Sequence, residues 1–175
     1  MSGRYLLLLM VAATVVIFIF GILQMSDRPK ELKQFPLNSL DGIITNSGVE
    51  FDQRISSDGK GSLRISVEEP AVIKLFEVRD ISVEDARLIY QMRIRTENLQ
   101  GDAYLEIRCS FPNRRELLSR GRSSRITGTQ DWSTQEATFY LARGMKTDGV
   151  KLNLVINGKG TVWVDDIRLT RAPLR

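Results

Sequence analysis

Residues 103–111 read AYLEIRCSF, and apolar and polar side chains alternate along this stretch without a break. One face carries the apolar members, which are Ala103, Leu105, Ile107, Cys109 and Phe111. The opposite face carries Tyr104, Glu106, Arg108 and Ser110. Successive side chains of a β-strand point to opposite sides, so this period of two predicts an antiparallel strand with one buried and one solvent-exposed face.

The same alternation recurs in residues 62–67, 87–96 and 150–157. Clusters of Gly with Asn or Asp separate these runs, as in 157–160 (NGKG), which is typical of a hairpin turn. About eight short strands with no convincing helix indicate an all-β domain. We therefore expect a two-sheet antiparallel jelly-roll sandwich over residues 41–171.

Three motifs in this region resemble a known group of domains. They are GSLRI at 61–65, GTQDW at 128–132 and GKGTVWVDDIRL at 158–169. In this order they resemble the galactose-binding-domain-like jelly rolls, especially family 4/9/22-type carbohydrate-binding modules. These close with a Gly-x-Gly-x-x-Trp-x-Asp-Asp strand after a Gly-Thr-x-Asp-Trp turn. The resemblance implies the jelly-roll fold, while the group contains sugar binders, protein binders and structural modules.

The apolar alternation of the last motif changes phase at Asp165 and Asp166, as a β-bulge would produce. The resemblance implies that a structural calcium ion lies near this point. Asp165 and Asp166 would supply ligands together with Glu50 and Asp52, and hard oxygen ligands suit Ca²⁺. The alternative is that the two aspartates cap turns or pair with arginines. We expect no other cofactor.

Four aromatic side chains are candidates for stacking against a sugar ring. Trp132 and Trp163 are expected to pack inside the sandwich instead. Tyr104 and Tyr140 fall on outward-facing positions and are the candidate glycan-facing residues. Only 7% of the residues are aromatic, which argues against a strong glycan site.

Residues 112–126 (PNRRELLSRGRSSRI) form an arginine-rich segment. The candidate partner-binding residues are Arg114, Arg115, Arg120, Arg122 and Arg125. Guanidinium groups bind carboxylates and phosphates in bidentate fashion, so the segment suits an acidic partner or lipid headgroups. The alternative is a solvated loop without a partner.

The first part of the chain contains 19 consecutive uncharged residues, 5–23, which is long enough to span a bilayer. We predict a transmembrane signal anchor at 1–25, a tether at 26–40 that Pro29 and Pro36 keep non-helical, and a short tail at 172–175. A cleavable signal peptide is the alternative. The short N-terminal tail with Arg4 favours an inner- or plasma-membrane protein with its sandwich in the periplasm or outside the cell. The positive-inside count slightly favours the cytoplasm instead.

The composition excludes several classes of function. The chain has no His and one Cys, which removes the side chains that most metal, thiol and acid–base chemistry uses, so we expect no enzyme activity. The part beyond the anchor carries 24 Lys and Arg against 21 Asp and Glu, too small an excess to indicate nucleic-acid binding.

We therefore predict a non-catalytic, membrane-anchored β-sandwich interaction module, an accessory or stabilising subunit of a larger membrane complex. Its partners would be the lipid bilayer and other integral membrane subunits. The alternative is a membrane-tethered carbohydrate-binding module.

Overall fold

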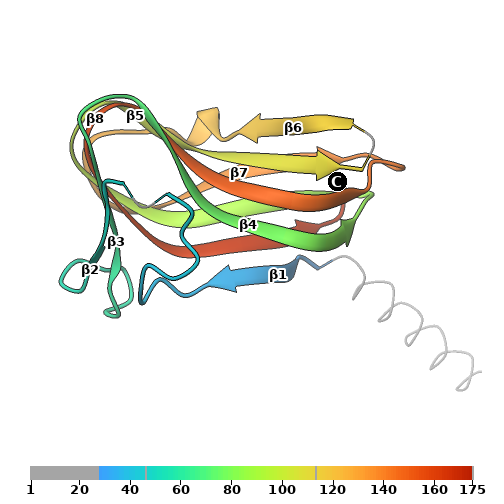
Figure 1. The fold of residues 1–175 in the computed structure, drawn as a ribbon, viewed down its shortest axis with the longest axis horizontal. Coiled ribbons are helices and arrows are strands. Elements are labelled where there is room, and N and C mark those ends of the chain that lie inside the picture. Colours follow the sequence, from blue (N-terminus) through green and yellow to red (C-terminus); the bar gives the residue numbers. More distant parts are fainter. Residues whose placement is uncertain (1–27, 46, 113, 175) are drawn as a thin grey trace, which may run out of the picture.

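The computed structural model describes residues 28–45, 47–112 and 114–174, with only the backbone of residues 114 and 115. Figure 1 shows a molecule built from strands, with one short 3₁₀ turn, η1 (Arg122–Ser124). The strands are β1 (Lys30–Phe35), β2 (Val49–Asp52), β3 (Ser62–Val67), β4 (Ala71–Val83), β5 (Ala86–Phe111), β6 (Arg114–Arg120), β7 (Ile126–Leu141) and β8 (Thr147–Ala172). All their pairings are antiparallel, which confirms the predicted all-β class.

The predicted membrane anchor at 1–25 lies outside the described residues. Within the described ranges, no helix has the length and apolar character needed to cross a bilayer.

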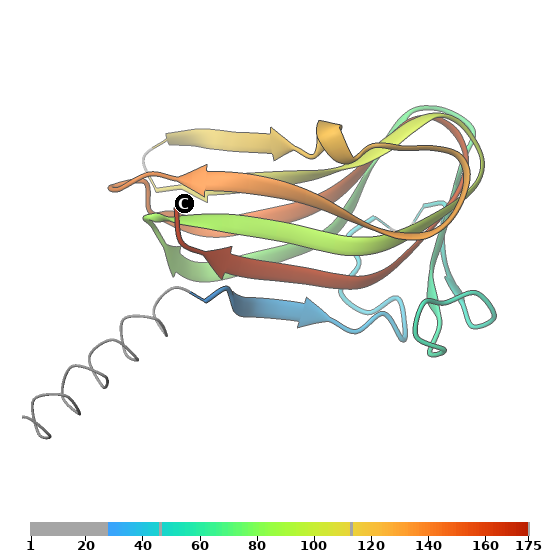
Figure 2. The same ribbon diagram turned by 180° about the vertical axis from the view of Figure 1, so that it is seen from behind.

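Two strands of 26 residues each, β5 and β8, form the centre of the molecule. They pair with each other from Arg87 and Ala172 at one end to Ser110 and Gly149 at the other. Figures 1 and 2 show both ribbons curving over at one end of the molecule and returning in a second layer. At this bend Gly101 faces Gly158, and a Cβ atom on Gly101 would lie 2.0 Å from the Asn157 carbonyl oxygen. The bend therefore requires glycine at this position.

The bend divides the ladder into two layers. Sheet I contains β4, the first half of β8, the second half of β5, and β6. Sheet II contains β1, β3 with β2, the second half of β8, the first half of β5, and β7. The predicted sandwich is therefore confirmed, and one continuous eight-stranded ladder forms both layers.

The core lies between the layers and contains the apolar residues predicted from the alternation. On β5, Leu105, Ile107 and Cys109 are fully buried in sheet I, as are Leu88 and Ile94 in sheet II. Fully burying a large aliphatic side chain stabilises the fold by about 1.5–3 kcal/mol relative to leaving it exposed, so this cluster holds the layers together. At one open side the rings of Phe35 and Phe76 stack with centroids 3.9 Å apart, joining β1 to β4.

The structure differs from the predicted boundaries in three places. The segment 26–40, predicted as a tether, contains β1, which pairs with β8 from Lys30 to Phe35. The segment 112–126, considered as a solvated loop, forms β6 and η1. At the other end β8 includes Ala172, the first residue of the predicted tail. The apolar positions of β1 are few, and its strand structure depends on the partner strand β8.

Candidate functional site

The most irregular backbone in the sandwich is a β-bulge in β8. Gln91 of β5 faces Arg168, and Arg93 faces Asp165, so one residue of β5 lies opposite two residues of β8. Asp166 is one of these two and has a positive φ of 47°. The bulge lies where the change of phase predicts it.

The two aspartates of the bulge have different hydrogen-bond partners. The Asp165 side chain is 4% exposed, and its Oδ1 accepts the Asp166 backbone N–H at 2.8 Å. Its Oδ2 accepts the Ser57 backbone N–H at 2.9 Å, which fastens the loop 53–61 to β8. Asp166 Oδ1 accepts the Arg168 Nε–H at 2.7 Å and an N–H of the Gln34 amide at 3.3 Å. The bulge thus brings a loop and strand β1 together.

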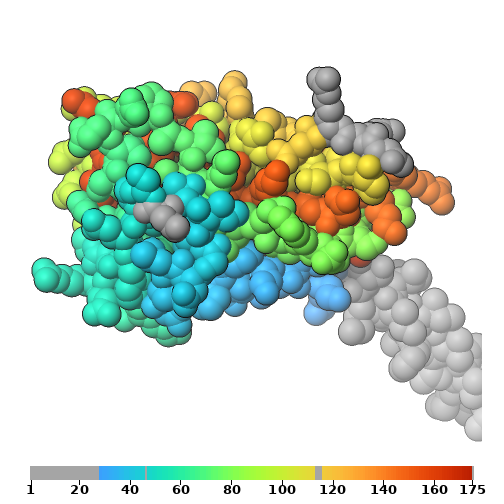
Figure 3. Space-filling model, in the orientation of Figure 1, coloured from blue at the N-terminus to red at the C-terminus, as the bar shows by residue number. Residues whose placement is uncertain are grey.

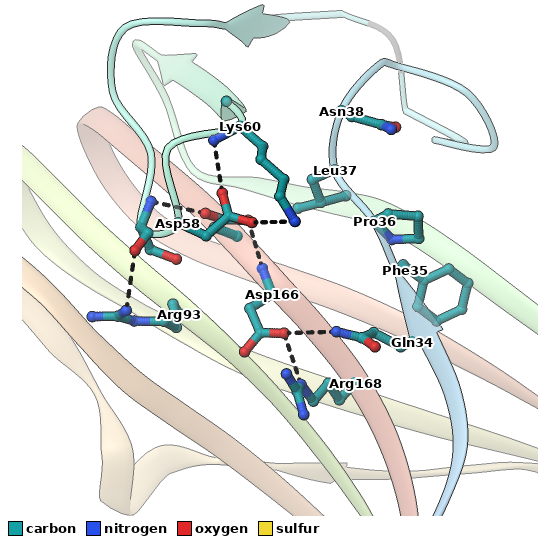
Figure 4. Close-up of a pocket in the computed structure, with 13 residues that line it drawn as sticks. Gln34, Phe35, Pro36, Leu37, Asn38, Asp58, Lys60, Arg93, Asp166 and Arg168 are labelled. Atoms are coloured by element: carbon teal, nitrogen blue, oxygen red, sulfur yellow. Dashed lines mark hydrogen bonds and ion pairs between the residues drawn. The ribbon is translucent and has the colours of Figure 1, made fainter.

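These contacts lie at an open cavity of about 540 Å³. It is lined by residues 34–38, by Ser57, Asp58, Lys60 and Gly61 of the loop, by Asp165, Asp166 and Arg168 of β8, and by Arg93 of β5. A second hollow of about 280 Å³ lies beside Gln91 and Thr134, and shares Arg93, Asp166 and Arg168 with the first. We call the two together the bulge groove. Figure 4 shows its polar side chains converging from β1, the loop, β5 and β8.

The charges of the bulge groove are largely compensated within it. Asp58 lies 3.7 Å from Lys60 Nζ, and Arg168 contacts both Asp166 and, at 3.5 Å, Glu31. The hydrogen bond to Asp166 raises the pKa of Arg168 above its ordinary value. Arg93 is half-buried and donates to the Ser57 carbonyl oxygen at 3.5 Å. The groove therefore offers hydrogen-bond donors and acceptors without a strong net charge.

Trp163 lies beside the groove, on the outer face of sheet II. The residue is 3% exposed, which confirms the predicted burial, although it does not belong to the apolar cluster between the layers. The guanidinium carbons of Arg64 and Arg95 each lie 5.9 Å from its ring. Its Nε1–H donates to Asp52 Oδ2 at 3.0 Å. This bond, with the backbone N–H groups of Arg54 and Ile55, lowers the pKa of Asp52. Trp132 is half-buried on β7.

The four predicted calcium ligands do not assemble into one cation site. Glu50 pairs with Arg64 at 3.2 Å, while Asp52 holds Trp163. Asp165 binds backbone N–H groups, and Asp166 binds Arg168. Within the described ranges, no group of three or more His, Cys, Asp or Glu side chains is placed to hold a metal ion. The residues therefore do not fit the implied calcium ion, and the arrangement is the alternative one of turn capping and arginine pairing.

The two candidate glycan-facing tyrosines do not form a platform. Tyr104 lies on the outer face of sheet I beside Val155, but it is only 5% exposed, so the prediction of an accessible ring is wrong. Tyr140 is 60% exposed and lies on β7 in the other layer. A sugar ring cannot stack on both.

The arginine-rich segment is distributed over two elements. Arg114 and Arg115 begin β6, and their side chains are outside the described part of the structure. Arg120 donates to Glu106, Arg125 donates to Asp102 at 3.0 Å, and Arg122 is exposed in η1. Two of the five therefore pair with carboxylates of β5.

No family model matches the chain, and no curated protein matches its sequence. Solved structures do match. The CBM22-1 xylan-binding domain of Paenibacillus barcinonensis Xyn10C matches with a TM-score of 0.62 at 13% identity, covering 85% of this chain and 99% of that one. The CBM22-1–GH10 modules of Clostridium thermocellum endo-1,4-β-D-xylanase 10B, solved with xylohexaose, match with a TM-score of 0.60 at 9% identity, covering 83% of this chain and 29% of that one.

The C-terminal family 22 carbohydrate-binding module of Clostridium thermocellum Xyn10B matches at 10% identity with a TM-score of 0.57, covering 81% of this chain and 93% of that one. At these identities the likeness concerns the fold. The chain therefore has a β-sandwich fold similar to that of these carbohydrate-binding modules, and the predicted resemblance is confirmed for the fold.

The sequence reasoning missed most of the groove. Gln34 and Asn38 belong to the predicted tether, and Ser57 acts through its backbone, which no side-chain motif reveals. Arg93 carries a weak signal, because it is an outward-facing arginine in an otherwise regular strand. Its place opposite Asp165 follows from the register of β5 and β8.

Proposed function

We propose that this chain is a non-catalytic carbohydrate-binding module that holds a neutral, hydroxyl-rich sugar in the bulge groove. The observation that supports this most directly is the groove itself, a cavity of about 540 Å³ whose lining carboxylates Asp58 and Asp166 are each paired with a cation. Ligand pockets of a few hundred Å³ with a small number of placed polar groups are typical binding sites for small molecules.

The lining suits hydroxyl groups. Gln34 and Asn38 carry amides that both donate and accept hydrogen bonds. The half-buried Arg93 lines both hollows and supplies N–H donors there. A sugar hydroxyl also donates and accepts, so it can satisfy such groups in pairs. The xylan-binding domain and the family 22 carbohydrate-binding module that have a similar fold support a carbohydrate as the ligand class.

The test is a binding measurement with the full chain purified in a mild non-ionic detergent. Calorimetry or affinity electrophoresis against neutral oligosaccharides, xylohexaose first, should detect binding. Arg93→Ala should weaken it by about tenfold or more, since a hydrogen bond from a charged donor contributes about 1.5–3 kcal/mol. Lys33→Ala is the matched control, because Lys33 is exposed on β1 next to Gln34 but does not line the groove. Absence of binding to every neutral glycan tried would refute the proposal.

A second candidate is the membrane-anchored accessory subunit that the sequence predicts. The specific observation in its favour is the pair Leu117 and Leu118 on β6, whose residues are 41% and 42% exposed on a strand that pairs only with β5. An exposed edge strand with apolar side chains is suited to a protein partner. Co-purification of the tagged full chain from membranes should then recover defined partner proteins, and Leu117→Lys with Leu118→Lys should abolish the recovery. If the purified chain sediments as a monomer and no partner protein is recovered with it, this candidate is contradicted.

A further inference from the structure

A buried carboxylate lies on the outer face of sheet I, in the layer away from the bulge groove. Glu106 of β5 is 1% exposed, although its strand position faces away from the core. In the pairing register it lies between Asn153 of β8 and Arg120 of β6. Figure 3 views the molecule from this side, with β4 in green, the first half of β8 in orange and β6 in yellow.

Three side chains donate to this carboxylate. Oε1 accepts the Arg108 Nε–H at 2.6 Å and an N–H of the Asn153 amide at 3.2 Å, while Oε2 accepts the Arg120 Nε–H at 2.8 Å. Burial raises the pKa of Glu106, but the hydrogen bonds from Arg120, Arg108 and Asn153 outweigh it, and the pKa lies below its ordinary value. Glu106 is therefore ionised at neutral pH.

A buried ion pair adds little net stability to the fold, because the desolvation of the charges offsets most of their attraction. It does fix the orientation of the paired side chains. Glu106 uses one nitrogen, Nε, of each arginine. Both guanidinium groups are planar, so fixing Nε fixes the direction of the remaining N–H groups. Glu106 thus holds two arginines in one orientation before any ligand arrives.

The arginines keep donors for a ligand. Arg108 and Arg120 have side chains that are 33% and 36% exposed. Beyond Glu106, Arg108 uses Nη1 for Glu116 at 3.3 Å, and Lys151 also donates to Glu116. Within the described part of the chain, the Nη groups of Arg120 and Nη2 of Arg108 make no hydrogen bond. The network holds three cations and two carboxylates, so its net charge is positive.

We propose that this arginine pair binds an oxyanion carried on a sugar chain, specifically the carboxylate of a hexuronate residue. The assignment to a sugar rests on the proposed function, whereas the assignment to an oxyanion rests on the network itself. Guanidinium N–H forks match the two oxygens of a carboxylate, and a pre-oriented fork loses less conformational entropy on binding. The row Lys74–Asn153–Glu106–Arg120 crosses four strands, and above its buried middle the partly exposed Arg108 and Arg120 are the groups that a ligand can reach.

The experiment measures binding of oligogalacturonate, the neutral xylohexaose and glycerol phosphate to the full chain in a mild non-ionic detergent. We expect oligogalacturonate to bind with an affinity that falls as salt rises. Arg120→Gln should reduce that affinity by about tenfold or more, and Arg120→Lys should also reduce it, because lysine keeps the charge but not the fork. Arg79→Gln is the matched control, since Arg79 is an exposed arginine of β4 that pairs with Glu77.

A second variant separates orientation from charge. Glu106→Gln makes the face more positive, so simple attraction would strengthen oligogalacturonate binding, whereas loss of the oriented pair should weaken it. Circular dichroism and thermal unfolding establish that each variant is folded before its affinity is compared.

The outcomes are distinct. Xylohexaose binding without oligogalacturonate binding overturns this inference and leaves the proposed function standing. Binding of neither sugar overturns both. Glycerol phosphate binding that depends on Arg120, without oligogalacturonate binding, overturns the sugar assignment in favour of a phosphate. Unchanged oligogalacturonate affinity in both Arg120→Gln and Glu106→Gln places the ligand elsewhere and overturns the site.

Discussion

The outer faces of the two layers both contain a buried carboxylate, and they use it differently. On sheet II, Asp165 is satisfied by backbone N–H groups of Asp166 and Ser57. On sheet I, Glu106 is satisfied by the side chains of Arg108, Arg120 and Asn153. The backbone partner Ser57 belongs to a loop that lies over the strand and lines a cavity, whereas the side-chain partners of Glu106 belong to the strands of its own sheet. Both residues carry the same charge, so the cavity beside Asp165 follows from the kind of hydrogen-bond partner that the carboxylate has.

The largest expected effect comes from removing the sheet I carboxylate. Glu106→Ala leaves Arg108 and Arg120 without their shared partner and opens a gap beside Asn153. We expect a loss of about 2–3 kcal/mol in the free energy of unfolding, below the value for a fully enclosed pair because both arginines reach water. Urea unfolding followed by tryptophan fluorescence measures this. A smaller loss of unfolding free energy in Glu106→Ala than in Asp165→Ala would contradict the expected order of the two carboxylates.

The corresponding change on sheet II should cost less stability and more binding. Asp165→Ala removes two hydrogen bonds to backbone N–H groups and releases the loop 53–61 from β8. We expect a loss of about 1–2 kcal/mol, together with loss of sugar binding in the bulge groove. The free energy of unfolding of Asp165→Asn, which keeps one acceptor oxygen, should lie between those of the wild type and Asp165→Ala. Binding that survives Asp165→Ala would show that the loop does not form the site.

Trp163→Phe tests the contact beside the groove. The ring stays between Arg64 and Arg95, but the Nε1–H bond to Asp52 is lost. We expect a loss of about 1 kcal/mol in urea unfolding. When Trp163→Phe is made in the Asp52→Asn variant, the loss in the free energy of unfolding should be smaller, because the acceptor is no longer charged. Equal costs in both backgrounds would show that the hydrogen bond is not the source of the effect.

The smallest expected effect is on the acid side of the stability profile. Burial raises the pKa of both Glu106 and Glu116, and stronger hydrogen bonds from arginine, lysine and amide groups lower it below the ordinary value. A carboxyl whose folded pKa is lowered stabilises the fold above its unfolded pKa, about 4.3 for Glu, and this stability is lost as pH falls below that value. Thermal melting between pH 6 and 3 should show the decline. It should be shallower in Glu106→Gln, and an identical slope would contradict the assignment.

The alternation of apolar residues was enough to predict several strands and much of the core, but it did not predict β1 or β6. Leu105, Ile107 and Cys109 are buried because every second residue of a strand meets the other layer, which is a local rule. The same rule placed Tyr104 on the outer face correctly, but it did not predict that the residue is covered there. Burial on an outer face depends on which neighbours cross over it, and those come from other parts of the chain.

The bulge at Asp165 and Asp166 was also predictable, since a change of phase in one strand is visible in its own residues. The bulge groove was not. It needs Gln34 of β1, Ser57 of the loop and Arg93 of β5 around the bulge, and no local pattern relates these positions. The same holds for two of the predicted calcium ligands, Glu50 and Asp52. Their partners in the structure, Arg64 and Trp163, are brought near by the register of β2, β3 and β8.

The amino-acid sequence alone predicted the all-β class, several strands with their buried faces and the position of the bulge, because these follow from interactions between residues close along the chain. The tertiary structure decided the long-range partners of the two buried carboxylates. Glu106 and Asp165 are both acidic residues in strands, but the packing of β6 brings Arg120 to the first, whereas the loop 53–61 brings the Ser57 backbone N–H to the second. Pairing between distant segments depends on the global fold, since a charge is satisfied by whichever donor the folded chain brings within hydrogen-bonding distance.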